Sequence, residues 1–198
     1  ILGHSEGGAI ALMLAADKQV DFVVSMSGMV ASGRETILQQ NKDMLHAMTA
    51  LSDDVINAYV QALGEGLDGI IAGKKPAEIP LPKMLPASMT QNFQAAIKQA
   101  DTPWFRYFLQ VNPSTIIGKI ACPVLAIGGK KDLQVNSTQH LSLLESGLKG
   151  KRNKIANLPD LNHLLQHCQK GTVDEYGEIE ETISPEALQI MIDWLKEL

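Results

Sequence analysis

The chain has 198 residues, 45% of them hydrophobic and 20% charged, which suits a globular domain with a sizeable core. The formal net charge of −5 and the lack of a basic run argue against nucleic acid as a partner, and no apolar stretch has the length of a membrane span. Cys122 and Cys168 do not make a disulfide framework. No motif requires a metal or an organic cofactor, so we expect neither, and the localisation stays open.

The chain opens with ILGHSEGGAIALMLAA, in which a serine stands between glycines. Residues 3–7 read G-x-S-x-G, a pattern typical of a sharp strand-to-helix turn that exposes a serine hydroxyl. Of the strand expected before this turn, only Ile1 and Leu2 remain. Small and aliphatic residues over 8–16 predict a helix after it. The β-branched run over 20–28, which ends in glycine, predicts a buried strand.

Residues 34–115 carry no strong strand signal. Helical patterns run over 35–51 and 52–71, the second with Ser52 as its N-cap. The proline-rich connector KKPAEIPLPKMLP cannot be a regular helix, and helical patterns return over 88–100 and 102–111. We expect this insert to form a helical cap.

The pattern then changes to alternating strands and helices. CPVLAIGG (122–129) predicts a strand, 136–148 a helix, 153–159 a weaker strand, and the segment after Ser184 an amphipathic helix. Such alternation predicts a parallel sheet with helices on its faces. We divide the chain into core residues 1–33, the insert 34–115, and a second core part 116–198.

Three side chains of this arrangement suit nucleophilic catalysis. A serine hydroxyl needs a base to take its proton, and the base needs a carboxylate to orient it. Asp132 follows the strand over 122–129, and His163 follows the strand over 153–159. Because the carboxyl ends of parallel strands meet at one edge of a sheet, we expect both near Ser5. The order Ser, Asp, His is that of the α/β-hydrolase arrangement.

The blocks GHSEGG, PVLAIGGKKDLQV and LPDLNH resemble the three site blocks of the α/β-hydrolase superfamily. Within it the sequence is most similar to bacterial carboxylesterase-like hydrolases related to the serine-aminopeptidase group. The segment EYGEIEETISPEAL also resembles the segment that follows the catalytic histidine in that subgroup. The resemblance covers the whole chain but only the later part of the family's fold. It implies an α/β-hydrolase fold without its N-terminal strands. It also implies a serine hydrolase that cleaves carboxylic esters, with Ser5 as nucleophile, Asp132 as orienting acid and His163 as base.

The family pattern places one oxyanion donor on the residue after the nucleophile, here the backbone N–H of Glu6. The second donor comes from a loop that precedes the nucleophile strand, and this sequence does not contain it. We therefore expect a C-terminal portion that is a poor enzyme alone, since one lost donor costs on the order of 100- to 1000-fold in rate. The strand over 20–26 would have an unpaired edge, which leaves a homodimer through that edge open.

Other residues of suitable type lie near the proposed ones. Asp160, three residues before His163, is the alternative acid, and GKKD is also an ordinary turn. His140 lies inside a predicted helix, where we expect it at the surface. His163 and His167, four residues apart and next to Cys168, have the spacing of metal ligands, but no further ligand cluster supports a metal site.

The substrate pocket is the least determined part. Trp104 and Phe105, in the aromatic segment TPWFRYF, and Met29, just after a strand, are candidates, with core packing as the alternative for each. Four methionines of the insert are further candidates with the same alternative: Met44, Met48, Met84 and Met89. Two other functions stay open, a peptidase or amidase with the same three residues and a non-catalytic interaction module.

Overall fold

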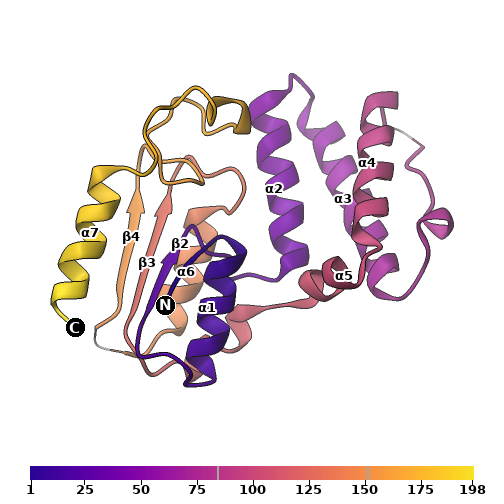
Figure 1. Ribbon diagram of the computed structural model, residues 1–198. Coiled ribbons are helices and arrows are strands. Elements are labelled where there is room, and N and C mark those ends of the chain that lie inside the picture. Colours follow the sequence, from indigo (N-terminus) through magenta and orange to yellow (C-terminus); the bar gives the residue numbers. More distant parts are fainter. Residues whose placement is uncertain (84, 151) are drawn as a thin grey trace. The chain divides into compact units, whose positions relative to one another are not determined.

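The computed structural model describes residues 1–83, 85–150 and 152–198 (Figure 1). The chain divides into two compact units. The sheet unit comprises Ile1–Ala31 and Asn112–Leu198, and the helical unit comprises Ser32–Val111.

The sheet unit is built on four parallel strands whose spatial order follows the sequence. They are β1 (Leu2–His4), β2 (Val23–Met26), β3 (Val124–Gly129) and β4 (Lys154–Leu158). All four therefore end at one edge of the sheet, which is where the chain turns that follow β1, β3 and β4 lie (Figure 1). The expected parallel sheet with flanking helices is confirmed.

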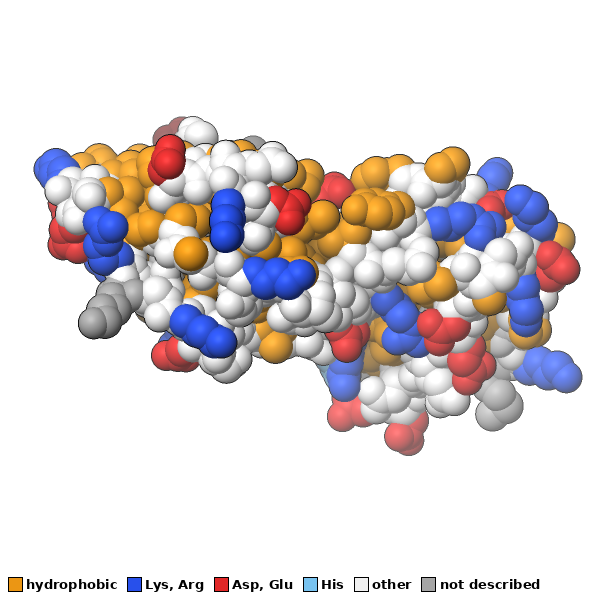
Figure 2. Space-filling model, turned by 90° about the horizontal axis from the view of Figure 1, so that it is seen from below, with side chains coloured by type: hydrophobic (Ala, Val, Ile, Leu, Met, Phe, Trp, Pro, Cys, Tyr) orange, Lys and Arg blue, Asp and Glu red, His pale blue; other side chains and the backbone are white. Residues whose placement is uncertain are grey.

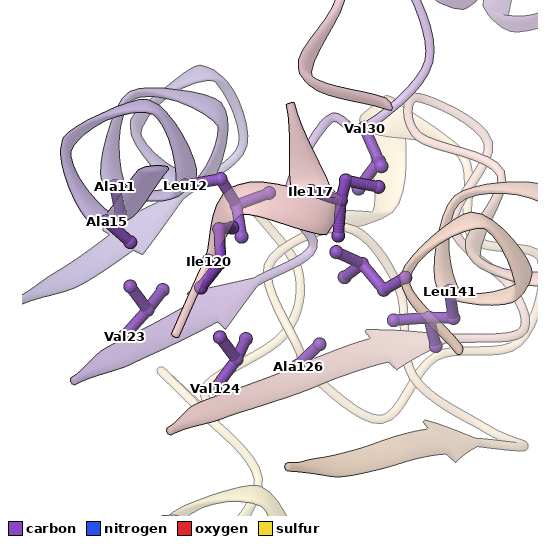
Figure 3. Close-up of a cluster of buried hydrophobic side chains, with 11 residues drawn as sticks. Ala11, Leu12, Ala15, Val23, Val30, Ile117, Ile120, Val124, Ala126 and Leu141 are labelled. Carbon is purple, nitrogen blue, oxygen red and sulfur yellow. The ribbon is translucent and has the colours of Figure 1, made fainter. Parts of the chain in front are cut away.

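Helices cover both faces of this sheet. Helices α1 (Glu6–Ala16) and α6 (Ser137–Gly147) pack on one face, and α7 (Pro185–Lys196) packs on the other (Figure 1). The side chains of β3 alternate between the two cores, as the period of a strand requires. Val124 and Ala126 join the core under α1, drawn in Figure 3, whereas Leu125 and Ile127 join the core under α7.

The expectation of an unpaired edge on the strand over 20–26 is wrong. β2 pairs with β1 on one side, with Gly3 opposite Ser25, and with β3 on the other. Even the three-residue strand β1 supplies enough backbone groups to make this pairing. Among the described residues, the outer strands of the sheet are β1 and β4.

His140 is also placed differently from the expectation of a surface residue. It is 1% exposed, and its ring Nδ1 accepts hydrogen bonds from the backbone N–H of Val30 at 2.8 Å and of Ala31 at 3.1 Å. These two amides follow β2, and among the described residues no backbone carbonyl accepts from them. The histidine therefore satisfies the backbone where the chain leaves the sheet.

The helical unit contains four α-helices and a single 3-10 turn among its described residues. They are α2 (Gly33–Met48), α3 (Asp53–Ile71), η1 (Pro76–Glu78), α4 (Ala87–Ala100) and α5 (Pro103–Gln110). Its apolar core includes Leu63, Phe93 and Ile97. Helix α2 begins two residues before the predicted start because Ser32 and Glu35 form a capping box.

The methionines of the insert have different surroundings. Met89 is buried in the core of the helical unit, whereas Met48 is exposed. Met84 lies outside the described residues. Short 3-10 turns complete the sheet unit: η2 (Pro113–Thr115), η3 (Ile117–Lys119) and η4 (Val173–Glu175).

The surface mixes charges of both signs. On the face that Figure 2 shows, Lys and Arg side chains are scattered between acidic and hydrophobic ones rather than gathered in one patch. Within residues 1–83, 85–150 and 152–198, no helix combines the length and apolar character that a bilayer crossing requires.

Candidate active site

Ser5 occupies a strained turn between β1 and α1. Its φ of 56° and ψ of −119° lie where L-residues are seldom found, at a cost of about 1–3 kcal/mol. Its N–H donates to the Met26 carbonyl at 3.0 Å, and its own carbonyl accepts from Met29 N–H at 3.2 Å. Serine at a helix N-cap usually caps with its side chain, but the Ser5 hydroxyl does not. The turn therefore holds the Ser5 backbone through two hydrogen bonds and leaves the hydroxyl out of the helix cap.

Two glycines make this turn possible through close backbone contacts. A β-carbon on Gly3 would lie 2.1 Å from the Gly7 carbonyl oxygen. A β-carbon on Gly8 would lie 2.7 Å from the α-carbon of Gly28, just after β2. No side chain fits at either position, so α1 starts directly against β1 and β2.

Asp132 and His163 form a buried pair. The Oδ2 atom of Asp132 lies 2.8 Å from Nδ1 of His163, and neither side chain is appreciably exposed. The other carboxylate oxygen, Oδ1, accepts from the N–H groups of Gln134 at 2.8 Å and Val135 at 2.9 Å. Because a carboxylate only accepts, the proton lies on His163 Nδ1. In the neutral ring, Nε2 then has a lone pair with which to take a proton.

The alternative candidates have other partners. Asp160 forms an ion pair with Lys131 at 3.1 Å, and Lys131 Nζ also donates to the Cys168 carbonyl at 2.9 Å. The His167 ring lies 3.0 Å from a carboxylate oxygen of Glu181. In the described part of the chain, no group of three or more His, Cys, Asp or Glu side chains is arranged to hold a metal ion.

Ser5 follows β1 at the carboxyl edge of the sheet, the edge at which Asp132 follows β3 and His163 follows β4. No hydrogen bond joins the Ser5 hydroxyl to His163 among the residues that the structure describes. The preceding residue, His4, makes the contact instead: its Nε2 lies 2.8 Å from the His163 carbonyl oxygen, and the two ring centroids are 4.7 Å apart. Catalytic hydrogen bonds of free enzymes are often long and tighten when substrate binds.

The remaining predicted site residues are spread over the two units. Glu6 is the first residue of α1, so its backbone N–H belongs to a helix N-terminus, which favours negative charge. Met29 is buried next to the turn, which it contacts through its backbone N–H. Phe105 is buried in the core of the helical unit. Trp104 is 53% exposed and stacks on Phe108, with centroids 5.4 Å apart.

Asn162 and Gln166 shape the turn that carries His163, and the sequence analysis did not single them out. The buried Asn162 Oδ1 accepts from the N–H groups of Leu164 at 2.9 Å and Gln166 at 3.0 Å, and Nδ2 donates to Gln166 Oε1 at 2.9 Å. Gln166 Nε2 donates in turn to the Glu181 carbonyl at 2.7 Å. An Asn directly before the histidine is a turn signal that would have indicated the first of these.

No protein-family model matches the chain, and no curated protein sequence matches it either. Solved structures do. VinJ is similar over 100% of this chain and 65% of its own, with 16% identity and a TM-score of 0.51. A meta-cleavage product hydrolase (CumD) from Pseudomonas fluorescens IP01 is similar over 100% and 64%, with 13% identity and a TM-score of 0.47. The esterase RhEst1 from Rhodococcus sp. ECU1013 is similar over 97% and 62%, with 16% identity and a TM-score of 0.45.

The solved structures that match are α/β-hydrolase-fold enzymes, and the likeness shows that this chain has part of the α/β-hydrolase fold. The fold expected from the sequence is thereby confirmed. The chain spans less than two thirds of the length of these structures, between 62% and 65% for the three above.

Proposed function

We propose that the chain carries the nucleophile, base and acid of a serine hydrolase that cleaves carboxylic esters. The observation that supports this most is the buried Asp132–His163 pair at the same sheet edge as the strained Ser5 turn. A serine that is held at positive φ, with its hydroxyl outside the helix cap, has a local structure suited to a nucleophile.

The chemistry follows from the tautomer of His163. As the Ser5 Oγ attacks the ester carbonyl carbon, His163 Nε2 takes the hydroxyl proton, and the Asp132 carboxylate stabilises the imidazolium. The carbonyl oxygen becomes an oxyanion, which accepts from the N–H of Glu6. The intermediate collapses, the C–O bond to the alcohol breaks, and the alcohol leaves with the proton from Nε2.

The second half repeats these steps with water. His163 Nε2 takes a proton from water as the water oxygen attacks the acyl-Ser5 carbonyl. The carboxylic acid then leaves, and the proton on Nε2 returns to the Ser5 Oγ. One ester and one water become one acid and one alcohol, with no cofactor.

A fluorophosphonate probe tests the proposal, because the oxygen of an activated serine attacks its phosphorus, expels fluoride and becomes phosphonylated. We expect the chain to be labelled at Ser5, and Ser5→Ala to abolish the labelling. Asp132→Asn lowers the labelling rate by on the order of 10⁴-fold, because it disturbs the tautomer of His163.

Ser27→Ala is the matched control. Ser27 lies just after β2, is buried and also has positive φ, and its hydroxyl has no hydrogen-bond partner in the described structure. This variant should fold and be labelled like the wild type. Equal labelling of the wild type and Ser5→Ala contradicts the role of Ser5, and no labelling of the wild type favours a non-catalytic module. Faster hydrolysis of p-nitrophenyl esters than of p-nitroanilides favours an esterase over an amidase.

A further inference from the structure

His4 connects the two segments that carry Ser5 and His163. Its Nε2 lies 2.8 Å from the carbonyl oxygen of His163, across 159 residues of sequence. Because a carbonyl only accepts, His4 Nε2 carries the proton and donates. The two imidazole rings are in contact as well, with centroids 4.7 Å apart and planes tilted by 53°. The backbone of His163 is thus held by His4, while its ring is held by Asp132.

This contact spans the sheet. Strands β1 and β4 are its two outer strands, so the segments that follow them start far apart. The chain after β4 returns over the end of β3, where the Lys131 N–H donates to the Leu161 carbonyl at 3.1 Å. Between β1 and this returning segment, the bond from His4 is the only hydrogen bond among the described residues. Since Ser5 follows His4 directly, the bond joins the residue before Ser5 to the backbone of His163.

We propose that His4 is a positioning residue that sets the separation between the Ser5 hydroxyl and the His163 ring. This inference rests on the proposed function. Its physical basis is that proton transfer requires the two groups within hydrogen-bond reach, and a misplacement of about 1 Å can cost on the order of 100-fold in rate. His4 itself takes no part in the bond-making steps.

Two variants separate the donor from the ring. His4→Phe keeps an aromatic ring next to His163 but removes the N–H donor. A phenyl ring has room there, because His4 borders a cavity of about 410 Å³ that Met26, Leu164 and Ile183 also line. His4→Gln removes the ring but places an amide N–H near the position of Nε2. His46→Phe, an exposed histidine of the helical unit, is the matched control.

We expect His4→Phe to lower the rate constant for fluorophosphonate labelling of Ser5 by on the order of 10- to 100-fold, at unchanged probe affinity. His4→Gln should recover most of the rate, and His46→Phe should equal the wild type. A second readout does not depend on activity. The downfield proton resonance of His163 Nδ1–H, assigned by its loss in Asp132→Ala, should shift or broaden in His4→Phe and return in His4→Gln.

The two readouts separate the possible failures. If the wild type is not labelled, the proposed function fails, and the resonance still shows whether His4 holds His163. If His4→Phe keeps the wild-type resonance, the positioning role is overturned, whatever its labelling rate. A loss of rate that His4→Gln does not recover also overturns it, because a general structural defect then explains the loss.

Discussion

Gly3 and Gly7 lie so close that a β-carbon on Gly3 would be 2.1 Å from the carbonyl oxygen of Gly7. The two outer glycines of G-x-S-x-G therefore differ in their roles. At Gly3 the space for a side chain is filled by the backbone of α1, whereas a β-carbon on Gly7 meets nothing within 4 Å. The motif requires glycine at its first position for a steric reason that its last position does not share.

Gly3→Ala should lower the free energy of unfolding by about 3 kcal/mol or more, because the obstructing atoms are backbone and cannot rotate away. Gly7→Ala should be neutral or stabilise by up to about 1 kcal/mol, because alanine is the better helix former. Urea unfolding of both variants, followed by circular dichroism, measures the difference. Equal losses in the two variants contradict the steric explanation.

His140→Phe should destabilise the sheet unit. The ring keeps its bulk but no longer accepts from the N–H groups of Val30 and Ala31, and each buried donor without an acceptor costs about 1–3 kcal/mol. We expect a loss of about 2–4 kcal/mol in urea unfolding. His140→Asn places an oxygen near the position of Nδ1 and should lose less. The explanation fails if Asn is as harmful as Phe.

The stability that Glu181 contributes should depend on pH. Burial acts to raise the pKa of Glu181, but hydrogen bonds from the His167 backbone and ring, and the charge of that ring, outweigh burial and lower this pKa below 4.5. A carboxyl with a lowered pKa stabilises the fold above its unfolded pKa and loses this effect as the pH falls through its folded pKa.

Wild-type protein should therefore be more stable than Glu181→Gln at pH 6, and the difference should shrink as the pH falls below 4.5. Unfolding in urea at several pH values, from pH 6 to well below 4.5, measures this difference. The exposed neighbour Glu180 makes no hydrogen bond in the described structure, so Glu180→Gln should show no such dependence. A constant difference for Glu181→Gln at all pH values contradicts the assignment.

Asn162→Ala should loosen the turn that carries His163. It leaves the N–H groups of Leu164 and Gln166 without their acceptor inside a buried turn, so we expect a loss of about 2–4 kcal/mol. Hydrogen exchange at these two amides should accelerate more than elsewhere. Asn41→Ala, which removes a bond on the partly exposed helix α2, should cost less than about 1 kcal/mol. Unchanged exchange at Leu164 contradicts the role of Asn162.

Local patterns predicted most of the sheet. The run at Val124–Gly129 is β-branched, apolar and ended by glycines, and it forms the fully buried strand β3. The glycines around Ser5 and the alternation of strands with helices likewise indicated the turn and the parallel order. These features depend on near neighbours in the sequence, where propensity and periodicity are informative. The capping box at Ser32 and Glu35 was equally local and was readable as S-x-x-E.

Contacts between distant segments could not be predicted in the same way. His140 occupies an ordinary helical position, and only the two amides that lie 110 and 109 residues earlier make it a buried acceptor. The contact of His4 with His163 spans 159 residues and follows from the return of the chain over β3. Single-sequence patterns carry no record of such pairings, so the supporting residues of the candidate site were missed while its three central residues were named.

Backbone hydrogen bonds join the two chain segments at which the helical unit begins and ends. Within the helical unit, the Gly33 N–H donates to the Val111 carbonyl at 3.0 Å, and within the sheet unit the Ser114 N–H donates to the Val30 carbonyl at 2.9 Å. These hydrogen bonds hold the two ends of the insertion together. The number and kind of residues between them therefore place no strain on the pairing of β2 with β3. Such a junction lets evolution, or an engineer, exchange one insertion for another of different size while the hydrolase-type scaffold stays in register.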